Sequence, residues 1–339
     1  MSHHFTAIHS SPVEVLSGPF GSRAPRYGLT TKQVFADERL DIARTILQEF
    51  KDAGTTVGVT PTFGANARGP EEKPFDKSHH EWNRQAASIT QQVFEGRKIL
   101  GSIAPLLDTS GADDHLWPER GGKWAQNRHA PQIDALRSSG VSGFLAEAVR
   151  YLDEGKTLAR LLEDSGAKEF ICSFEARDPE GKFPHQRDLT FEQIRNEIVL
   201  ATRGKINIGI GINCASAEDC TRVLENEPKG VIDAVYPNKA KVGNGHETAR
   251  FIALSQKSGR TAAEDDEYGK LGALLQTGEQ ELRTLVERCF EQRARLIGIC
   301  CGGTPDDVRF LRGLTNEYNA KNSKRRVPVA ARSILDVVG

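Results

Sequence analysis

The sequence lacks any long hydrophobic run, and no segment approaches the roughly 18 apolar residues that a membrane-spanning helix requires. Its first residues, Met1 to Ser11, contain no basic stretch followed by an apolar one, so no signal peptide is expected. Low-complexity segments and internal repeats beyond a strand–helix unit are also absent from the sequence. These absences predict a globular protein of the cytoplasm, with no membrane partner.

An excess of charge of either sign is missing as well. Lysine and arginine number 45 and aspartate and glutamate 46, which gives a net charge of −1. This balance argues against a basic nucleic-acid footprint or an acidic tail. Six cysteines in 339 residues without an export signal are expected to be thiols rather than a disulfide framework. The expected partners are therefore small molecules.

Strand-like and helix-like segments alternate strictly along the chain. Short apolar runs typical of strands lie at 13–18, 55–62, 98–105, 143–149, 169–175, 207–214, 234–238 and 294–301. Segments with helical spacing of apolar residues lie at 37–53, 81–94, 129–139, 157–164, 191–202, 217–226, 279–292 and 305–316. Alternation predicts parallel strands joined by crossovers, and eight such units are the number that closes a barrel.

We therefore predict an α/β protein, a single (β/α)8 TIM barrel over residues 1–339. A doubly wound open sheet is the alternative, but Gly209 and Gly211 lie inside a strand-like run instead of opening a helix, as a dinucleotide fingerprint would require. We also expect a long polar loop at 106–122, a polar insertion at about 239–277 and a C-terminal extension at about 320–339. The extension is expected to lie on the surface or to form a homo-oligomer contact.

Three cysteines stand at the ends of two predicted strands. Cys214 ends the run at 207–214, and Cys300 and Cys301 end the run at 294–301. A (β/α)8 barrel builds its site at the carboxyl ends of its strands, so these thiols could converge. Adjacent residues of a strand point to opposite faces, so both members of the pair can reach one metal only if the chain turns, which Gly302 and Gly303 permit.

Three thiolates and an open fourth position suit a catalytic Zn²⁺ site. A zinc ion with three thiolate ligands is already electron-rich, so it is better suited to keeping an incoming thiol deprotonated than to generating hydroxide. This chemistry indicates alkyl transfer onto sulfur. Packing, in contrast, is the expected role of the three cysteines in mid-strand or on helices, which are Cys172, Cys220 and Cys289.

Other polar residues also fall at predicted strand ends. Glu147 interrupts an apolar strand, and because a buried carboxylate without a partner is costly, a ligand-binding role is favoured over an ion pair. Glu175 could pair with Arg177 or Lys182 at the rim. His129 is expected on a helix surface or against the barrel, and not on a metal. Two asparagines could equally hydrogen-bond backbone or substrate, namely Asn213 and Asn238.

Two motifs resemble a known family. Gly-Ile-Asn-Cys, residues 211–214, and Gly-Ile-Cys-Cys-Gly-Gly-Thr-Pro, residues 298–305, are similar to the two zinc motifs of the homocysteine S-methyltransferase family. Similarity continues through most of the chain. It includes the glycine motif at 16–21, the strand end at 60–63, the His-x-x-Gln-type helix at 129–136, the glutamate strand at 144–147 and the Tyr-Pro-Asn segment at 235–238.

The resemblance implies a zinc-dependent S-methyltransferase of methionine biosynthesis. Its catalytic residues and Zn²⁺ ligands would be Cys214, Cys300 and Cys301. A methyl group would pass from a sulfonium donor, S-methylmethionine or S-adenosylmethionine, to the zinc-bound thiolate of homocysteine, giving methionine. Glu147 would bind the amino group of the acceptor. The full set of substrate-binding residues implied by the resemblance is Ser17, Gly18, Phe63, Glu147, Asn213 and Asn238.

The sequence departs from the family at three positions. Ser17 stands where the family carries an aspartate that helps to hold the acceptor's amino group, Ile299 replaces a glycine, and Ala148 replaces a residue that often bears a hydroxyl. Ala148 argues against a betaine-type donor. Three alternatives stay open. Ser17 motivates two of them, a different thiol acceptor and a zinc-binding barrel without catalysis. The third is a zinc-dependent demethylase that uses a quaternary amine as donor.

Overall fold

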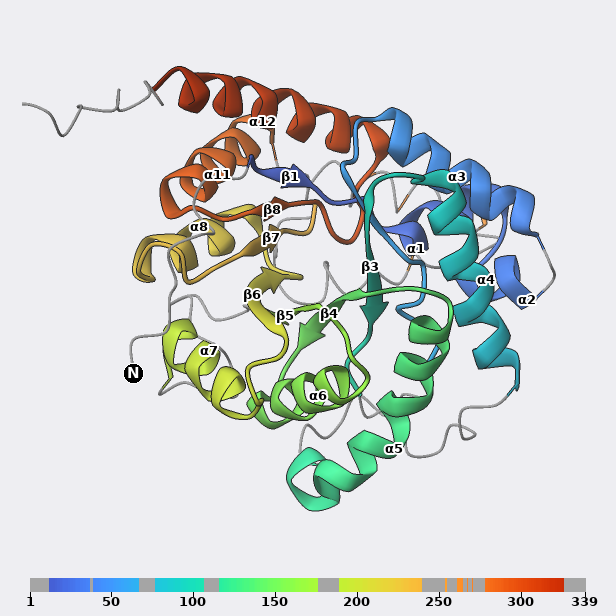
Figure 1. Cartoon of the computed structure of the whole chain (residues 1–339). Coiled ribbons are helices and arrows are strands. Elements are labelled where there is room, and N and C mark those ends of the chain that lie inside the picture. The colour runs from blue at the N-terminus through green and yellow to red at the C-terminus, as the bar shows by residue number, and fades with distance from the viewer. Residues whose placement is uncertain are drawn as a thin grey trace, which may run out of the picture.

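Eight parallel strands gather at the centre of the molecule and the helices surround them (Figure 1). The computed structural model describes residues 12–36, 39–66, 77–106, 116–175, 189–239 and 278–325, together with residues 254, 261–264, 267 and 270. The strands are β1 Glu14–Val15, β2 Val57–Val59, β3 Lys98–Ile103, β4 Gly143–Val149, β5 Glu169–Glu175, β6 Asn207–Asn213, β7 Ala234–Tyr236 and β8 Leu296–Ile297.

The sheet closes on itself. Its order is β1-β8-β7-β6-β5-β4-β3-β2, and β1 continues into a parallel bridge between Leu16 and Val57 at the start of β2. The Thr56 amide donates to the Val15 carbonyl at 2.8 Å across this junction. Both edges of the sheet are therefore joined, and the predicted (β/α)8 barrel is confirmed.

The helices in the described part of the chain form the outer layer. They are α1 Phe20–Arg23, α2 Thr31–Ala36, α3 Leu40–Asp52, α4 Lys77–Val93, α5 Leu116–Ser138, α6 Leu152–Asp164, α7 Phe191–Leu200, α8 Ala217–Asn226, α11 Glu279–Gln292 and α12 Pro305–Arg325, with a 3₁₀ helix η1 at Ala24–Tyr27. Local chemistry explains where several begin. Thr190 and Gln193 form a capping box at the start of α7, and Pro305 occupies the first turn of α12.

The hydrophobic core has two layers. The larger one lies between strands and helices, where α3, for example, buries Ile46, Leu47 and Phe50 at helical spacing. The smaller one fills the inside of the barrel with side chains from six strands and the residues that follow them, including Leu16, Val57, Leu100, Leu145, Ile171, Tyr236, Leu296 and Cys300. The barrel is thus packed through its middle, and a reaction site has room only at an end.

Several predicted boundaries were wrong. The expected loop at 106–122 is helical from Leu116, and α5 includes a proline near its start and a glycine pair at 121–122. Each of these glycines costs about 1 kcal/mol of helix stability against alanine. Helix α12 continues to Arg325, beyond the expected end at 316. There the ring of Tyr318 stacks on Phe290 of α11 with centroids 4.9 Å apart. Strands β1 and β8 are shorter than predicted, and the short helices between 20 and 36 were not expected.

Two further expectations concern residues that the structure covers only partly. The polar insertion at 239–277 and the C-terminal extension lie mostly outside the described residues.

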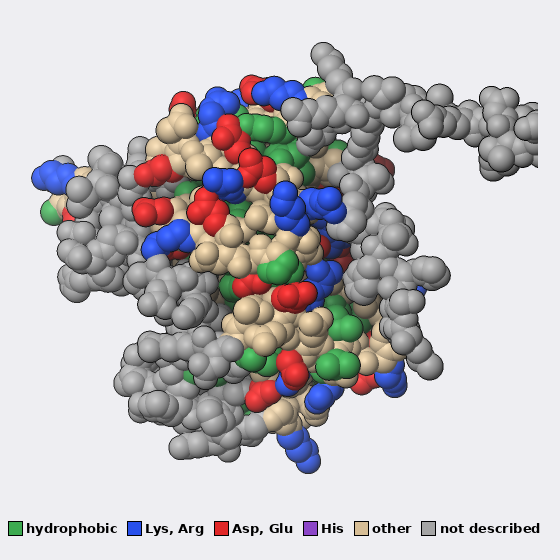
Figure 2. Space-filling model, turned by 90° about the vertical axis from the view of Figure 1, so that its left-hand side faces the viewer, with side chains coloured by type: hydrophobic (Ala, Val, Ile, Leu, Met, Phe, Trp, Pro, Cys, Tyr) green, Lys and Arg blue, Asp and Glu red, His purple; other side chains and the backbone are tan. Residues whose placement is uncertain are grey.

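Among the described helices, none combines the length and the apolar character that a membrane crossing requires. Figure 2 shows acidic and basic side chains interspersed over the face that carries α7, α8 and α11. Arg288 of α11, for instance, lies 3.0 Å from Glu225 of α8.

Glu163 at the end of α6 provides a test of stability. Its carboxylate accepts hydrogen bonds from the backbone amides of Arg203 and Lys205 at 2.8–2.9 Å. Burial alone would raise its pKa, but these bonds hold the pKa of Glu163 below its ordinary value. A carboxyl group with a lowered pKa stabilises the fold above its unfolded pKa, and this stability is lost as the pH falls.

Glu163→Gln is therefore expected to lower the free energy of unfolding by about 1–3 kcal/mol at pH 7. The difference from wild type should shrink below pH 4.5, the ordinary value for this group. Urea denaturation at pH 7 and pH 4 measures both effects. The control is Asp164→Asn, whose carboxylate is 64% exposed and pairs with Arg203 on the surface, so its effect should stay below about 1 kcal/mol. Equal losses in both variants would contradict the assignment.

Candidate metal centre and substrate pocket

Three thiols meet at the carboxyl end of the barrel. Cys214 follows β6, and Cys300 and Cys301 follow β8. The Sγ atoms of Cys214 and Cys300 are 3.5 Å apart and those of Cys300 and Cys301 are 3.9 Å apart. All three sulfur atoms lie within 4.8 Å of one another. Tetrahedral zinc with Zn–S bonds of about 2.3 Å requires sulfur atoms about 3.8 Å apart, so this donor set fits a zinc ion.

Backbone turns aim these thiols at one point. Cys214 has φ +54°, and Gly302 has φ +81°, a left-handed conformation that glycine adopts without strain. The Gly303 amide donates to the Cys300 carbonyl at 3.0 Å and closes the turn after β8. Two adjacent cysteines consequently reach the same cluster, as the glycine pair was expected to allow.

Neighbouring thiols also influence one another's ionisation. Hydrogen bonds from Cys214 and Cys300 hold the pKa of Cys301 well below its ordinary value. The hydrogen bond to Cys300, followed by that to Cys301, raises the pKa of Cys214. A bound cation would favour the ionised form of all three thiols.

Asn213, the last residue of β6, has both ends of its amide engaged within the protein. Its Oδ1 accepts from the Ser173 hydroxyl at 2.9 Å and from the Ala148 amide at 3.0 Å. Its Nδ2 donates to Cys214 Sγ at 3.2 Å. The structure thus places Asn213 behind the thiols, where it can orient a metal ligand. Its predicted contact with substrate stays a prediction.

Glu147 lies on β4, at the same end of the barrel as the thiols. It occupies a bulge of β4, where the pairing with β5 shifts register between Ala146 and Val149 and Ala148 has φ +55°. The hydroxyl of Ser102 on β3 donates to its carboxylate. Tyr236 is buried nearby, and burial followed by the Glu147 charge raises the pKa of its phenol, which therefore stays protonated.

The other predicted substrate-binding residues also follow strand ends at this mouth. Ser17 is 8% exposed, and its hydroxyl accepts a hydrogen bond from the Val59 amide at 2.9 Å. A side chain at Gly18 would place its Cβ 2.2 Å from the ring of Phe50, so only glycine fits there. Phe63 is 37% exposed, whereas Asn238 is 2% exposed. The structure thus gathers the predicted set at one end, with Asn213 and Asn238 the most buried of its polar members.

The structure also places the other histidine, glutamate and cysteine residues that the sequence analysis considered. His129 is buried and lies 3.0 Å from Glu154, and the cluster of possible metal ligands in the described residues consists of the three cysteines. Glu175 pairs with Arg150 at 2.9 Å; the partners expected for it, 177 and 182, lie outside the described residues. The three packing cysteines are fully buried, and burial raises the pKa values of Cys172, Cys220 and Cys289.

Three polar residues inside the barrel were missed by the sequence reasoning. Ser102, Ser173 and Tyr236 are each at most 3% exposed, and all contact or approach a predicted site residue. Their signal in the sequence is weak, because a serine in an apolar strand is as common in packing as in function. Only the alternation of strand faces, applied to β5 and β6 together, would have placed Ser173 beside Asn213.

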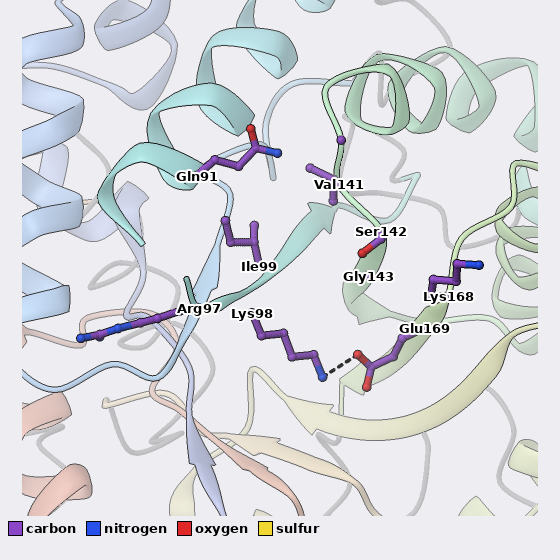
Figure 3. Close-up of a pocket in the computed structure, with 10 residues that line it drawn as sticks. Gln91, Arg97, Lys98, Ile99, Val141, Ser142, Gly143, Lys168 and Glu169 are labelled. Atoms are coloured by element: carbon purple, nitrogen blue, oxygen red, sulfur yellow. Dashed lines mark ion pairs between the residues drawn. The ribbon is translucent and has the colours of Figure 1, made fainter. Parts of the chain in front are cut away.

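A cavity of about 270 Å³ lies at the opposite end of the barrel, where β3, β4 and β5 begin. Figure 3 shows Lys98 reaching toward Glu169 across it. Their charged atoms are 2.5 Å apart, and Arg295 approaches the same carboxylate at 3.8 Å. No residue of the thiol cluster lines this cavity, so the two are separate.

The fold and the site together define a (β/α)8-barrel enzyme with a thiol-rich centre at its mouth that can hold a metal. A family model described as homocysteine S-methyltransferase matches residues 14–314. The chain therefore belongs to the homocysteine S-methyltransferase family, and it is a methyltransferase.

Individual relatives agree with this assignment. Homocysteine S-methyltransferase of Escherichia coli (strain K12) is 24% identical over 294 residues, which cover 81% of this chain and 84% of that protein. Homocysteine S-methyltransferase 1 of Saccharomyces cerevisiae is 23% identical over 326 residues and 90% of each chain. The metallated form of the homocysteine methyltransferase MmuM from Escherichia coli has the same fold, with a TM-score of 0.58 and 18% identity over 89% of this chain and 96% of that one.

Proposed function

We propose that this enzyme transfers a methyl group from a sulfonium donor to homocysteine, with Zn²⁺ held by Cys214, Cys300 and Cys301. The observation that carries the proposal is the set of three sulfur atoms within 4.8 Å of one another at the end of the barrel that also bears Glu147. A bound zinc would supply the positive charge that keeps the acceptor's sulfur deprotonated near neutral pH.

The chain's own residues would bind and orient the acceptor. The Glu147 carboxylate, held by the Ser102 hydroxyl, offers a negative charge to the ammonium group of an amino acid. With that group fixed at β4, the thiol of the same molecule would extend toward the cluster at β6 and β8. Such alignment of sulfur with the methyl carbon is the main contribution that a protein can make to this displacement.

The chemistry balances without a redox partner. The acceptor's thiol loses its proton to solvent on binding, its sulfur forms a new bond to the methyl carbon, and the bond from that carbon to the donor's sulfonium breaks. The electron pair of the broken bond stays on the donor's sulfur, which becomes a neutral thioether. With S-methylmethionine as donor, both products would be methionine. The reaction needs reduced thiols, and all six cysteines are free, which supports a cytoplasmic location.

The test is a panel of donors with deuterium-labelled homocysteine and the zinc-loaded enzyme. Mass spectrometry separates labelled methionine, made from the acceptor, from unlabelled methionine, left by the donor. We expect labelled methionine from S-methylmethionine or S-adenosylmethionine and little from betaine. Zinc-loaded, folded enzyme that makes no labelled methionine from any of these donors would contradict the proposal.

A second candidate is the same reaction on another thiol. The observation that favours it is Ser17, whose hydroxyl accepts the Val59 amide and carries no charge for an ammonium group. A parallel panel of thiols, including cysteine and 4-mercaptobutyrate, tests this candidate. A higher kcat/KM for either of these thiols than for homocysteine would favour it.

A further inference from the structure

One side chain, Asn213, joins two unusual backbone positions on β4 and directly after β6, the strands on either side of β5. In the described part of the chain, the non-glycine residues with positive φ are Ala148, Cys214 and Arg293. Non-glycine residues rarely adopt this conformation and keep it only where their surroundings enforce it. The Ala148 amide donates to Asn213 Oδ1, and Asn213 Nδ2 donates to Cys214 Sγ. The two positions are therefore held through the same amide.

The orientation of that amide is fixed by its neighbours. A backbone N–H can only donate, so the end of Asn213 that faces Ala148 must be the oxygen. The Ser173 hydroxyl donates to the same oxygen at 2.9 Å and is fully buried. With Oδ1 held by two donors, the NH₂ end must face Cys214. Gly211 leaves the room that this arrangement needs, because a Cβ there would lie 2.8 Å from Ser173 Oγ.

We propose that Ser173 is a positioning residue for the metal and acceptor sites, acting through Asn213. On one side it holds the N–H donor against Cys214 Sγ. On the other it supports the turn at Ala148, the residue directly after Glu147. This inference rests on the proposed function for the role of Glu147, whereas its metal-binding half depends only on the cluster.

A consequence is that binding of the metal and binding of the acceptor are thermodynamically coupled. A metal that fixes Cys214 also fixes Asn213, and through Asn213 the bulge that carries Glu147. Binding at either place should therefore favour binding at the other by the same factor. Partners of metal ligands typically contribute 10–100-fold to metal affinity or activity, and for Ser173→Ala we expect about tenfold weaker zinc binding.

The experiment is a double-mutant cycle with Ser173→Ala, Asn213→Ala and the pair. Zinc affinity is measured by competition with a chromophoric chelator. The thiolate-to-metal absorption of the Co²⁺-loaded protein reports on the Cys214 sulfur, and kcat/KM for homocysteine reports on the acceptor side. If Ser173 acts through Asn213, Ser173→Ala should cost about tenfold in the wild-type background but less than about twofold in the Asn213→Ala background.

The matched control is Cys172→Ala. It removes one heavy atom from the neighbouring buried residue of β5, which packs in the outer core, so zinc affinity and the Co²⁺ spectrum should remain those of wild type. Should Ser173→Ala not fold, Ser173→Cys keeps a weaker donor at the same place and should shift both readouts in the same direction by less.

Equal costs of Ser173→Ala in both backgrounds, or an unchanged zinc affinity in the wild-type background, would overturn the proposal. The metal readouts need no methyl transfer. If they show the expected coupling while no donor yields labelled methionine, the positioning role stands and the proposed function fails.

Discussion

Replacing Cys300 by alanine is expected to leave the purified protein with little zinc, whereas the wild-type chain should carry about one ion. Cys300 Sγ is 3.5 Å from that of Cys214 and 3.9 Å from that of Cys301, so its loss removes one of the three proposed donors. Two remaining thiols cannot complete a stable tetrahedral site. In the proposed function, loss of the metal would remove both the alignment of homocysteine and the charge that favours its thiolate, so methyl transfer should fall by at least about 100-fold.

Elemental analysis of protein purified under reducing conditions without chelators measures the zinc content. The matched control is Cys289→Ala, which removes a fully buried thiol of α11. It should reduce stability through the cavity it leaves but keep its zinc. Wild-type protein without zinc would contradict the site, and so would a Cys300→Ala variant that retains a full complement.

Much of the fold could be predicted because each element carries its own local signal. The bounds of β4, β5, α8 and α11 agree with the expected segments, and each combines a clear apolar period with glycine or polar residues at its ends. The start of α5 failed for the opposite reason. Its first turns contain a proline and two glycines, which locally favour a loop, and tertiary packing of Ala125 and His129 outweighs that preference.

The site, like the fold, has one part that the sequence predicts and another that it does not. The thiol cluster was predictable because barrel topology alone brings strand ends together, whatever the details of each strand. The contacts of Ser173 and Asn213 were not, since they depend on register between β5 and β6 and on a bulge in β4. Register and bulges are set by the packing of the whole barrel, so they have no short motif in the sequence.

The structure also bears on which residue would hold the ammonium group of an amino-acid acceptor in the proposed function. Two carboxylates near the carboxyl ends of neighbouring strands, Glu147 of β4 and Glu175 of β5, lie at the mouth. Glu175 is 2.9 Å from Arg150, whose positive charge offsets it. Ser17 has no charge and its hydroxyl is engaged with Val59. Glu147 accepts a hydrogen bond from the Ser102 hydroxyl, and in the proposed function its carboxylate supplies the negative charge for the acceptor's ammonium group.

Glu147→Gln is accordingly expected to lower kcat/KM for homocysteine by about 30- to 150-fold, the equivalent of 2–3 kcal/mol for a hydrogen bond to a charged group. Most of the loss should appear in KM, because the ammonium contact exists before and during methyl transfer. With 4-mercaptobutyrate, which has no amino group, the variant and wild type should differ by less than about threefold.

Zinc content serves as the control, and it should equal that of wild type because glutamine replaces glutamate without a change in size. The variant tests the charge alone, since Ser102 can still donate to the amide oxygen. Equal losses for homocysteine and 4-mercaptobutyrate would show that Glu147 supports the mouth without binding the amino group. A loss confined to homocysteine would establish that the Glu147 carboxylate binds the amino group of the acceptor, although Ser17 supplies no second carboxylate.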